Sequence, residues 1–121
     1  MSHSVNLDQL PPIDFADALN RIGGDTSFLS ELLTLYFEEY AEKKRHLEEA
    51  IARHEYVRVS ELGHSLKGAS ANLSLSRLRR VAFSLETAGR EKKIQLVKEA
   101  ALSLETEVQA LKSYLEQHPL R

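Results

Sequence analysis

His64, Lys67 and Gly68 together could carry a phosphoryl group. Residues three and four apart are neighbours on a helix, so Lys67 and Gly68 both lie beside His64 in a stretch that reads as helix. A neutral imidazole is a good nucleophile near neutral pH, because its ordinary pKa is about 6.5. An ammonium group beside it could offset the charge of a phosphoryl group and donate hydrogen bonds to it. The spacing therefore predicts a phosphoryl-accepting histidine.

Small residues are predicted to surround the histidine on the same helix face. At about 100° per residue, His64 points away from the apolar stripe of its helix and shares the outer half with Ser60, Lys67, Gly68 and Ala71. Glycine inside a helix costs about 1 kcal/mol relative to alanine, and close packing explains Gly68 poorly so far from the stripe. We therefore expect Ser60, Gly68 and Ala71 to form a low, open docking surface around an exposed imidazole.

Only helices are predicted to position these residues. No segment alternates between apolar and polar residues with period two, whereas apolar residues recur at steps of three and four. The predicted helices cover about residues 14–22, 26–53, 56–73, 76–89 and 94–115. Gly23 and Gly24 end the first helix, and Pro119 follows the last. The pattern predicts an all-α fold: an antiparallel four-helix bundle with a short additional N-terminal helix capping one end.

Length and composition indicate one domain. The 121 residues divide into a predicted flexible tail at 1–12 and a helical bundle at 13–118, and 42% hydrophobic residues suffice for a compact core. The net charge of −2 argues against nucleic acid as the main partner, and the absence of cysteine excludes disulfides and cysteinyl metal sites. No apolar run approaches the roughly 20 residues of a membrane helix, and no signal peptide is visible. We expect a cytoplasmic monomer with no membrane partner.

The stretch from His64 to Leu73 resembles the histidine-containing phosphotransfer family of multistep phosphorelays. It is similar to the family's pattern of histidine, any residue, leucine, lysine, glycine and two small residues. Gly23-Gly24-Asp25 and Leu85-Glu86 followed by Gly89-Arg90 also resemble the family, and the resemblance covers about residues 13–117. Ser74 departs from the pattern, because many members have glycine there, at the end of the helix.

The resemblance implies roles for particular residues. His64 accepts a phosphoryl group from an aspartyl phosphate of one receiver domain and passes it to the aspartate of another. Lys67 stabilises the phosphoryl group, and Gly68 leaves room for the receiver. The expected partners are receiver domains of response regulators, hybrid sensor kinases or both. The family does not bind ATP, so no autonomous catalysis and no cofactor is expected in this domain, and Mg²⁺ belongs to the receiver.

Two other functions remain open from the sequence. The first is a non-catalytic helical interaction domain on which a receiver or another partner docks without phosphotransfer. The second is an autonomous enzyme, for which the sequence offers neither a glycine-rich phosphate loop after a strand nor a His-Glu-x-x-His metal motif. The five histidines include no pair at ligand spacing on one helix, so no metal site is predicted.

Arg77, Arg79 and Arg80 stand at the start of the predicted fourth helix, where positive charge is unfavourable. They either meet an acidic partner or belong to a solvated surface, and the solvated surface is the commoner case.

Overall fold

The computed structural model describes residues 10–120, and this part of the chain folds into five α-helices with no strand. The helices are α1 (Phe15–Arg21), α2 (Thr26–Ala52), α3 (Tyr56–Asn72), α4 (Ser76–Arg90) and α5 (Ile94–Gln117). The all-α prediction is confirmed, with helix ends within about two residues of those expected. Residues 1–9 of the predicted tail lie outside the described residues. The described end of that tail contacts the bundle: Pro12 is buried, and the Leu10 carbonyl accepts a hydrogen bond from Arg77.

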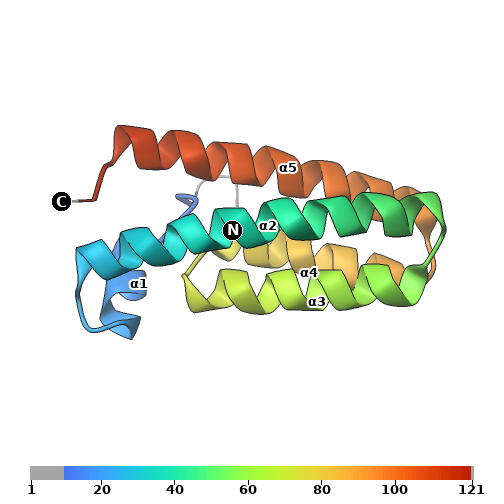
Figure 1. Ribbon diagram of the computed structural model, residues 1–121, viewed down its shortest axis with the longest axis horizontal. Helices are drawn as coiled ribbons and strands as arrows, with labels where there is room; N and C mark the ends of the chain where they lie inside the picture. The colour runs from blue at the N-terminus through green and yellow to red at the C-terminus, as the bar shows by residue number, and fades with distance from the viewer. Residues whose placement is uncertain (1–9, 121) are drawn as a thin grey trace, which may run out of the picture.

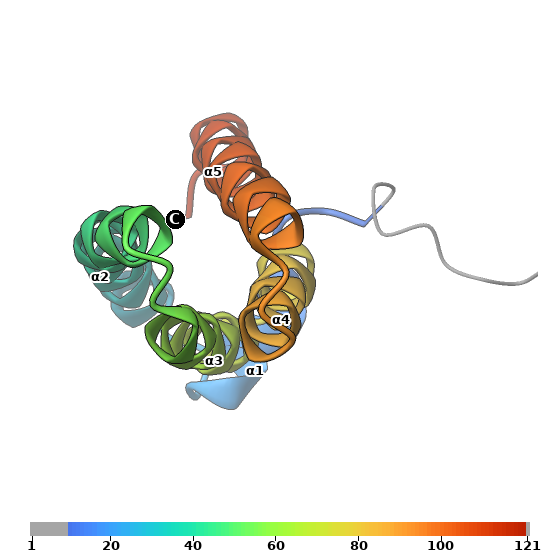
Figure 2. The ribbon, with the colours of Figure 1, turned by 90° about the vertical axis from the view of Figure 1, so that its right-hand side faces the viewer.

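Helices α2 to α5 lie side by side along one axis (Figure 1). Residues 53–55, 73–75 and 91–93 connect them, and such short connections reverse the chain between neighbouring helices. Seen along the axis, the four helices follow one another around a common centre (Figure 2). Helix α1 lies at the end of the bundle where α3 turns into α4, and the Asp14 amide donates to the Ser74 carbonyl there. The short first helix therefore covers this end.

The three turns between α2 and α5 share one backbone geometry. His54, Ser74 and Lys92 each have a φ between 54° and 58°, in the left-handed region that favours glycine. Each donates its amide to the carbonyl three residues back, and the following residue donates to the carbonyl five residues back. This is the Schellman ending of a helix, in which glycine is the usual left-handed residue. Ser74 has an added contact, because its hydroxyl donates to the Asp17 carboxylate on α1.

Lys92→Gly is expected to stabilise the protein. A left-handed residue with a β-carbon costs about 1–2 kcal/mol, and the greater freedom of glycine in the unfolded chain offsets part of the relief. We expect the free energy of unfolding to rise by about 0.5–1 kcal/mol and the Tm by roughly 2–5 °C. Thermal and urea unfolding measure both quantities. Lys92→Ala is the control, because it removes the side chain and keeps the β-carbon; equal stabilisation by both variants would contradict the backbone explanation.

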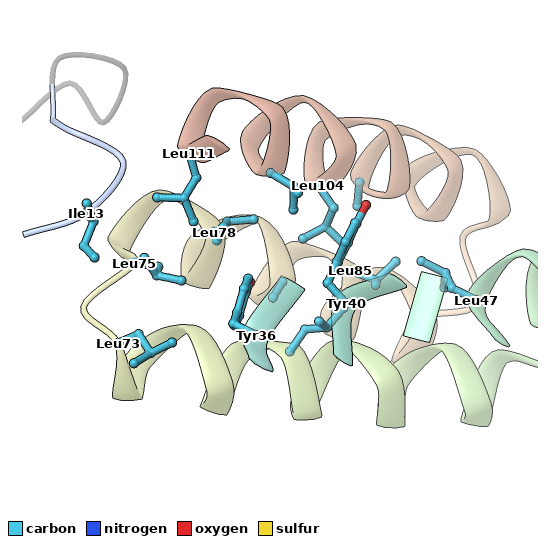
Figure 3. Close-up of a cluster of buried hydrophobic side chains, with 14 of the residues drawn as sticks. Ile13, Tyr36, Tyr40, Leu47, Leu73, Leu75, Leu78, Leu85, Leu104 and Leu111 are labelled. Atoms are coloured by element: carbon cyan, nitrogen blue, oxygen red, sulfur yellow. The ribbon is translucent and has the colours of Figure 1, made fainter. Parts of the chain in front are cut away.

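The centre of the bundle is apolar, with two buried or partly buried polar contacts. Figure 3 shows leucines of α4 and α5 pointing toward the tyrosines of α2, among them Leu78, Leu85 and Leu104. The Tyr36 hydroxyl lies 2.9 Å from Ser70 Oγ of α3, and the Tyr40 hydroxyl donates to Glu105 Oε2 of α5 over 2.6 Å. Burial raises the pKa of Tyr36 to about 12, because a phenolate is unfavourable away from water. These bonds join α2 to both of its neighbours.

Two glycines bring α3 and α4 into close contact. A β-carbon at Gly63 would lie 2.6 Å from the Glu86 backbone nitrogen, and one at Gly89 would lie 2.8 Å from the Ser60 nitrogen. The inward face of α3 consequently differs from the apolar stripe that the sequence predicts for this helix, which consists of Val59, Leu62, Leu66, Ala69 and Leu73. Leu62 and Ala69 of that stripe are only partly buried, whereas Gly63 and Ser70 are buried. Because each helix carries a glycine at this contact, the buried face of α3 is turned toward Gly63 and the two backbones touch.

Across residues 10–120, no helix combines the length and the apolar character that crossing a membrane requires.

Candidate functional site

His64 lies near the middle of α3, on the side of that helix next to α4. Its side chain is 70% exposed, as the helical periodicity predicts. One ring nitrogen, Nδ1, lies 2.8 Å from Oε2 of Glu86 on α4. The imidazole is thus presented to solvent while a neighbouring helix holds one of its two nitrogens.

Glu86 also binds Lys67. The Lys67 ammonium donates to Glu86 Oε1 over 2.6 Å, so the two carboxylate oxygens contact two different α3 residues. The Glu86 side chain is 11% exposed and that of Lys67 26% exposed. The hydrogen bond from Lys67, followed by that from His64, lowers the pKa of Glu86 below its usual range, although burial acts in the opposite direction. Glu86 is therefore ionised at neutral pH.

The ionised carboxylate determines which ring nitrogen of His64 is available. A carboxylate only accepts hydrogen bonds, so the neutral imidazole must carry its proton on Nδ1 to bond with Glu86. The lone pair then resides on Nε2, the nitrogen that makes no hydrogen bond within the described residues. An exposed, unprotonated Nε2 is suited to attack an electrophile that a second molecule presents.

The predicted docking residues occupy different environments on α3. Gly68 is exposed, and a β-carbon there would meet nothing within 4 Å, so packing does not require glycine at this position. Ala71 is half-buried. Ser60 is also half-buried, with its backbone nitrogen in the contact between α3 and α4 that Gly89 makes possible. Access for a partner at Gly68 stays a prediction, whereas Ser60 stands at the edge of the helix interface.

Helical periodicity predicts no role for Glu86, which lies 22 residues from His64 along the chain. A signal was nevertheless present in the pattern of α4. Glu86 lies one turn after buried Ala82 and beside buried Leu85, so it is a carboxylate within an apolar face. Buried carboxylates are usually paired, and an acidic residue at such a position indicates a partner on the facing helix.

A comparison with protein-family models bears directly on this arrangement. The model described as the Hpt domain matches residues 31–114, which is more than half of the chain. The chain belongs to the Hpt domain family. A comparison of the chain with curated proteins found no match. Hpt domains are histidine phosphotransfer intermediates of phosphorelays and interact with receiver domains.

The matched part of this Hpt domain begins within α2, ends within α5 and contains His64, Lys67, Gly68 and Glu86. Helix α1 lies outside it. In the part of the chain that the structure describes, no three histidine, aspartate or glutamate side chains gather into a metal-binding group.

Proposed function

We propose that this Hpt domain is a phosphorelay intermediate that receives a phosphoryl group on Nε2 of His64. The donor is the aspartyl phosphate of one receiver domain, and the recipient is the aspartate of another, in response regulators or hybrid sensor kinases. The observation that carries the proposal is the exposed imidazole whose Nδ1 is held by Glu86 at 2.8 Å. This arrangement supplies a positioned nucleophile on a rigid helix.

The transfer step forms one bond and breaks another, and it involves the imidazole, the acyl phosphate and Glu86. The Nε2 lone pair attacks the phosphorus of the acyl phosphate, so an N–P bond forms. The P–O bond to the aspartate breaks, and the aspartate leaves as a carboxylate with the electron pair. The product imidazole carries positive charge while Nδ1 keeps its proton, and the Glu86 carboxylate stabilises that charge. The second transfer reverses these bond changes on another receiver.

Lys67 and Gly68 assist this step in the proposal. The Lys67 ammonium is one helical turn from His64, where it can donate to the phosphoryl oxygens after shifting from Glu86. Gly68 leaves open space beside the ring, which allows the receiver to bring its aspartate close. The receiver supplies Mg²⁺ and the remaining positive charge, so the Hpt domain needs neither a metal nor ATP of its own.

The test is transfer of radiolabelled phosphate from a phosphorylated receiver domain to the purified protein. We expect the label to be acid-labile and base-stable, as N-linked phosphate is, and to map to the peptide that contains His64. A second receiver added afterwards should remove the label. If receivers bind the protein but none transfers phosphate to it, the domain is instead a non-catalytic docking module.

Glu86→Ala is expected to slow transfer by about 10–100-fold, the size of effect seen when a carboxylate that orients a metal-binding imidazole is removed. The variant leaves Nδ1 and Lys67 without their shared partner. Glu86→Gln should lose less, because its amide oxygen can still accept from Nδ1. Single-turnover transfer rates measure the effect, and nitrogen NMR of the His64 ring reports whether Nδ1 remains the protonated nitrogen.

Glu116→Ala, at an exposed position of α5, is the control for removing a glutamate. If Glu86→Ala transfers phosphate at the wild-type rate, Glu86 does not act by orienting the imidazole. The same conclusion follows if the variant transfers slowly while Nδ1 of its His64 ring remains the protonated nitrogen.

A further inference from the structure

We infer that the face of α4 around Phe83 docks the receiver, through an exposed aromatic side chain and two arginines that bind carboxylates of the receiver. This inference rests on the proposed function, because the partner is the receiver domain that exchanges phosphate with His64. It adds a second helix to the docking surface and a charge preference to the choice of receiver.

Phe83 is an exposed aromatic residue next to the reactive site. Its side chain is 51% exposed, and the Lys67 ammonium lies 5.3 Å from the centre of its ring. Phe83 also borders two hollows on the surface of α4. One, of about 330 Å³, is lined by Lys67, Ser76, Arg79, Arg80 and Phe83. The other, of about 440 Å³, lies between α4 and α5 and includes Val81 and Leu96. An aromatic ridge between two hollows is suited to anchor a protein partner.

The first hollow is electropositive. Arg79 and Arg80 are exposed, and neither forms a salt bridge within residues 10–120. Lys67 is paired with Glu86, and Asp17 of the nearby α1 is paired with Arg21 at 2.9 Å. Asp14, which lines a neighbouring hollow together with Arg79, caps the N-terminus of α1 and forms no salt bridge with that arginine within the described residues. The N-terminus of α4 adds to the two arginine charges, since it has no side-chain cap and no acidic residue in its first turn.

Arg77 differs from its two neighbours. Its guanidinium binds Glu107 of α5, with Nε 2.8 Å from Oε2, and both side chains are less than 20% exposed, at 19% and 14%. From the sequence, all three arginines either meet an acidic partner or belong to a solvated surface, whereas Arg77 has an acidic partner, Glu107, inside the fold. Of the three arginines, Arg79 and Arg80 are therefore the two that face outward, in a protein whose net charge is −2.

Charge complementarity identifies the occupant. Two unpaired guanidinium groups beside an aromatic ring favour a segment with aspartate or glutamate, and guanidinium groups bind carboxylates in bidentate pairs. The hollow is continuous with the His64 site through Lys67, so a receiver whose phosphorylated aspartate reaches His64 also covers it. Charges at the edge of a protein interface, such as these arginines, act mainly on the rate of association and on its salt dependence.

The experiment begins by labelling His64 with phosphoramidate, a small phosphate donor that needs no docking surface. Transfer from the labelled protein is then measured with two receiver domains, one with several carboxylates beside its acceptor aspartate and one with few. The double variant Arg79→Glu/Arg80→Glu should be labelled by phosphoramidate like wild type. Its kcat/KM toward the acidic receiver should fall by about 10–100-fold at low salt and recover partly near 0.5 M salt.

Two further variants sharpen the result. Arg53→Glu/Lys92→Glu makes the same charge change in turns at the opposite end of the bundle from the α3–α4 turn, and it should transfer like wild type (Figure 1). Phe83→Ala should lower the affinity for the receiver by about tenfold or more. Replacing the receiver's carboxylates with lysine should restore transfer from the arginine-reversed protein to that receiver.

The inference is overturned if arginine reversal leaves transfer to the acidic receiver unchanged, or if the distant charge reversal slows it equally. Binding titrations separate this failure from failure of the proposed function. Arginine-dependent binding without transfer supports the docking surface and contradicts phosphotransfer. Transfer and binding that are both independent of the arginines support phosphotransfer and contradict the docking surface, and no binding by any receiver contradicts both.

Discussion

His64→Gln is expected to abolish phosphate uptake from a phosphorylated receiver, with a loss of at least about 10³-fold. The glutamine amide has no nucleophilic lone pair, so no N–P bond can form, and removing a nucleophile has the largest effects known for single residues. The measurement is incorporation of radiolabel after mixing with the receiver, for variant and wild type at equal concentration. Binding of the receiver should survive, since the side chain keeps a similar size.

The fold of this variant should be intact, which makes the loss interpretable. The introduced amide can still donate to Glu86, so we expect the free energy of unfolding to change by no more than about 0.5 kcal/mol. His118→Gln is the matched control: His118 is an exposed histidine whose Nδ1 lies 3.0 Å from the Tyr114 carbonyl and whose ring stacks on Tyr114, and this variant should accept label like wild type. Label on His64→Gln, or loss of label from His118→Gln, would mean that another residue accepts the phosphate.

Gly63→Ala is expected to destabilise the protein by about 2–3 kcal/mol, although alanine is the better helix former. The new β-carbon would stand 2.6 Å from the nitrogen and 2.8 Å from the α-carbon of Glu86. Both are backbone atoms that cannot rotate away, so α3 and α4 must separate and lose packing. Thermal unfolding should show a Tm lower by roughly 5–10 °C. Phosphate transfer should fall as well, because Glu86 moves away from His64.

Gly68→Ala is the control for this prediction and should have the opposite effect on stability. A β-carbon at Gly68 meets nothing within 4 Å, so the gain in helix propensity raises the free energy of unfolding by up to about 1 kcal/mol. Transfer from a receiver should nevertheless become slower, because the added methyl group lies where the receiver approaches. Equal destabilisation by the two variants would contradict the assignment of Gly63 to helix packing and Gly68 to partner access.

The contrast between these glycines shows where prediction from the sequence reaches its limit. Both lie within the same helix, and periodicity separated only Gly68 from the apolar stripe. The buried contact of Gly63 with the Glu86 backbone depends on how α4 is rotated and shifted along α3. Arg77 makes the same point, since its partner Glu107 lies 30 residues away on α5.

The sequence by itself determined the helices, their order and the exposed face that His64, Lys67 and Gly68 share. These features are local, because a period of 3.6 residues fixes which side chains lie on one face of one helix. The tertiary structure alone decided that Glu86 holds both His64 and Lys67, and hence which imidazole nitrogen is available. Contacts between side chains on different helices depend on how closely the helices pack and on how far one is shifted along the other. In this protein the approach of α3 to α4 follows from two missing side chains, at Gly63 and Gly89.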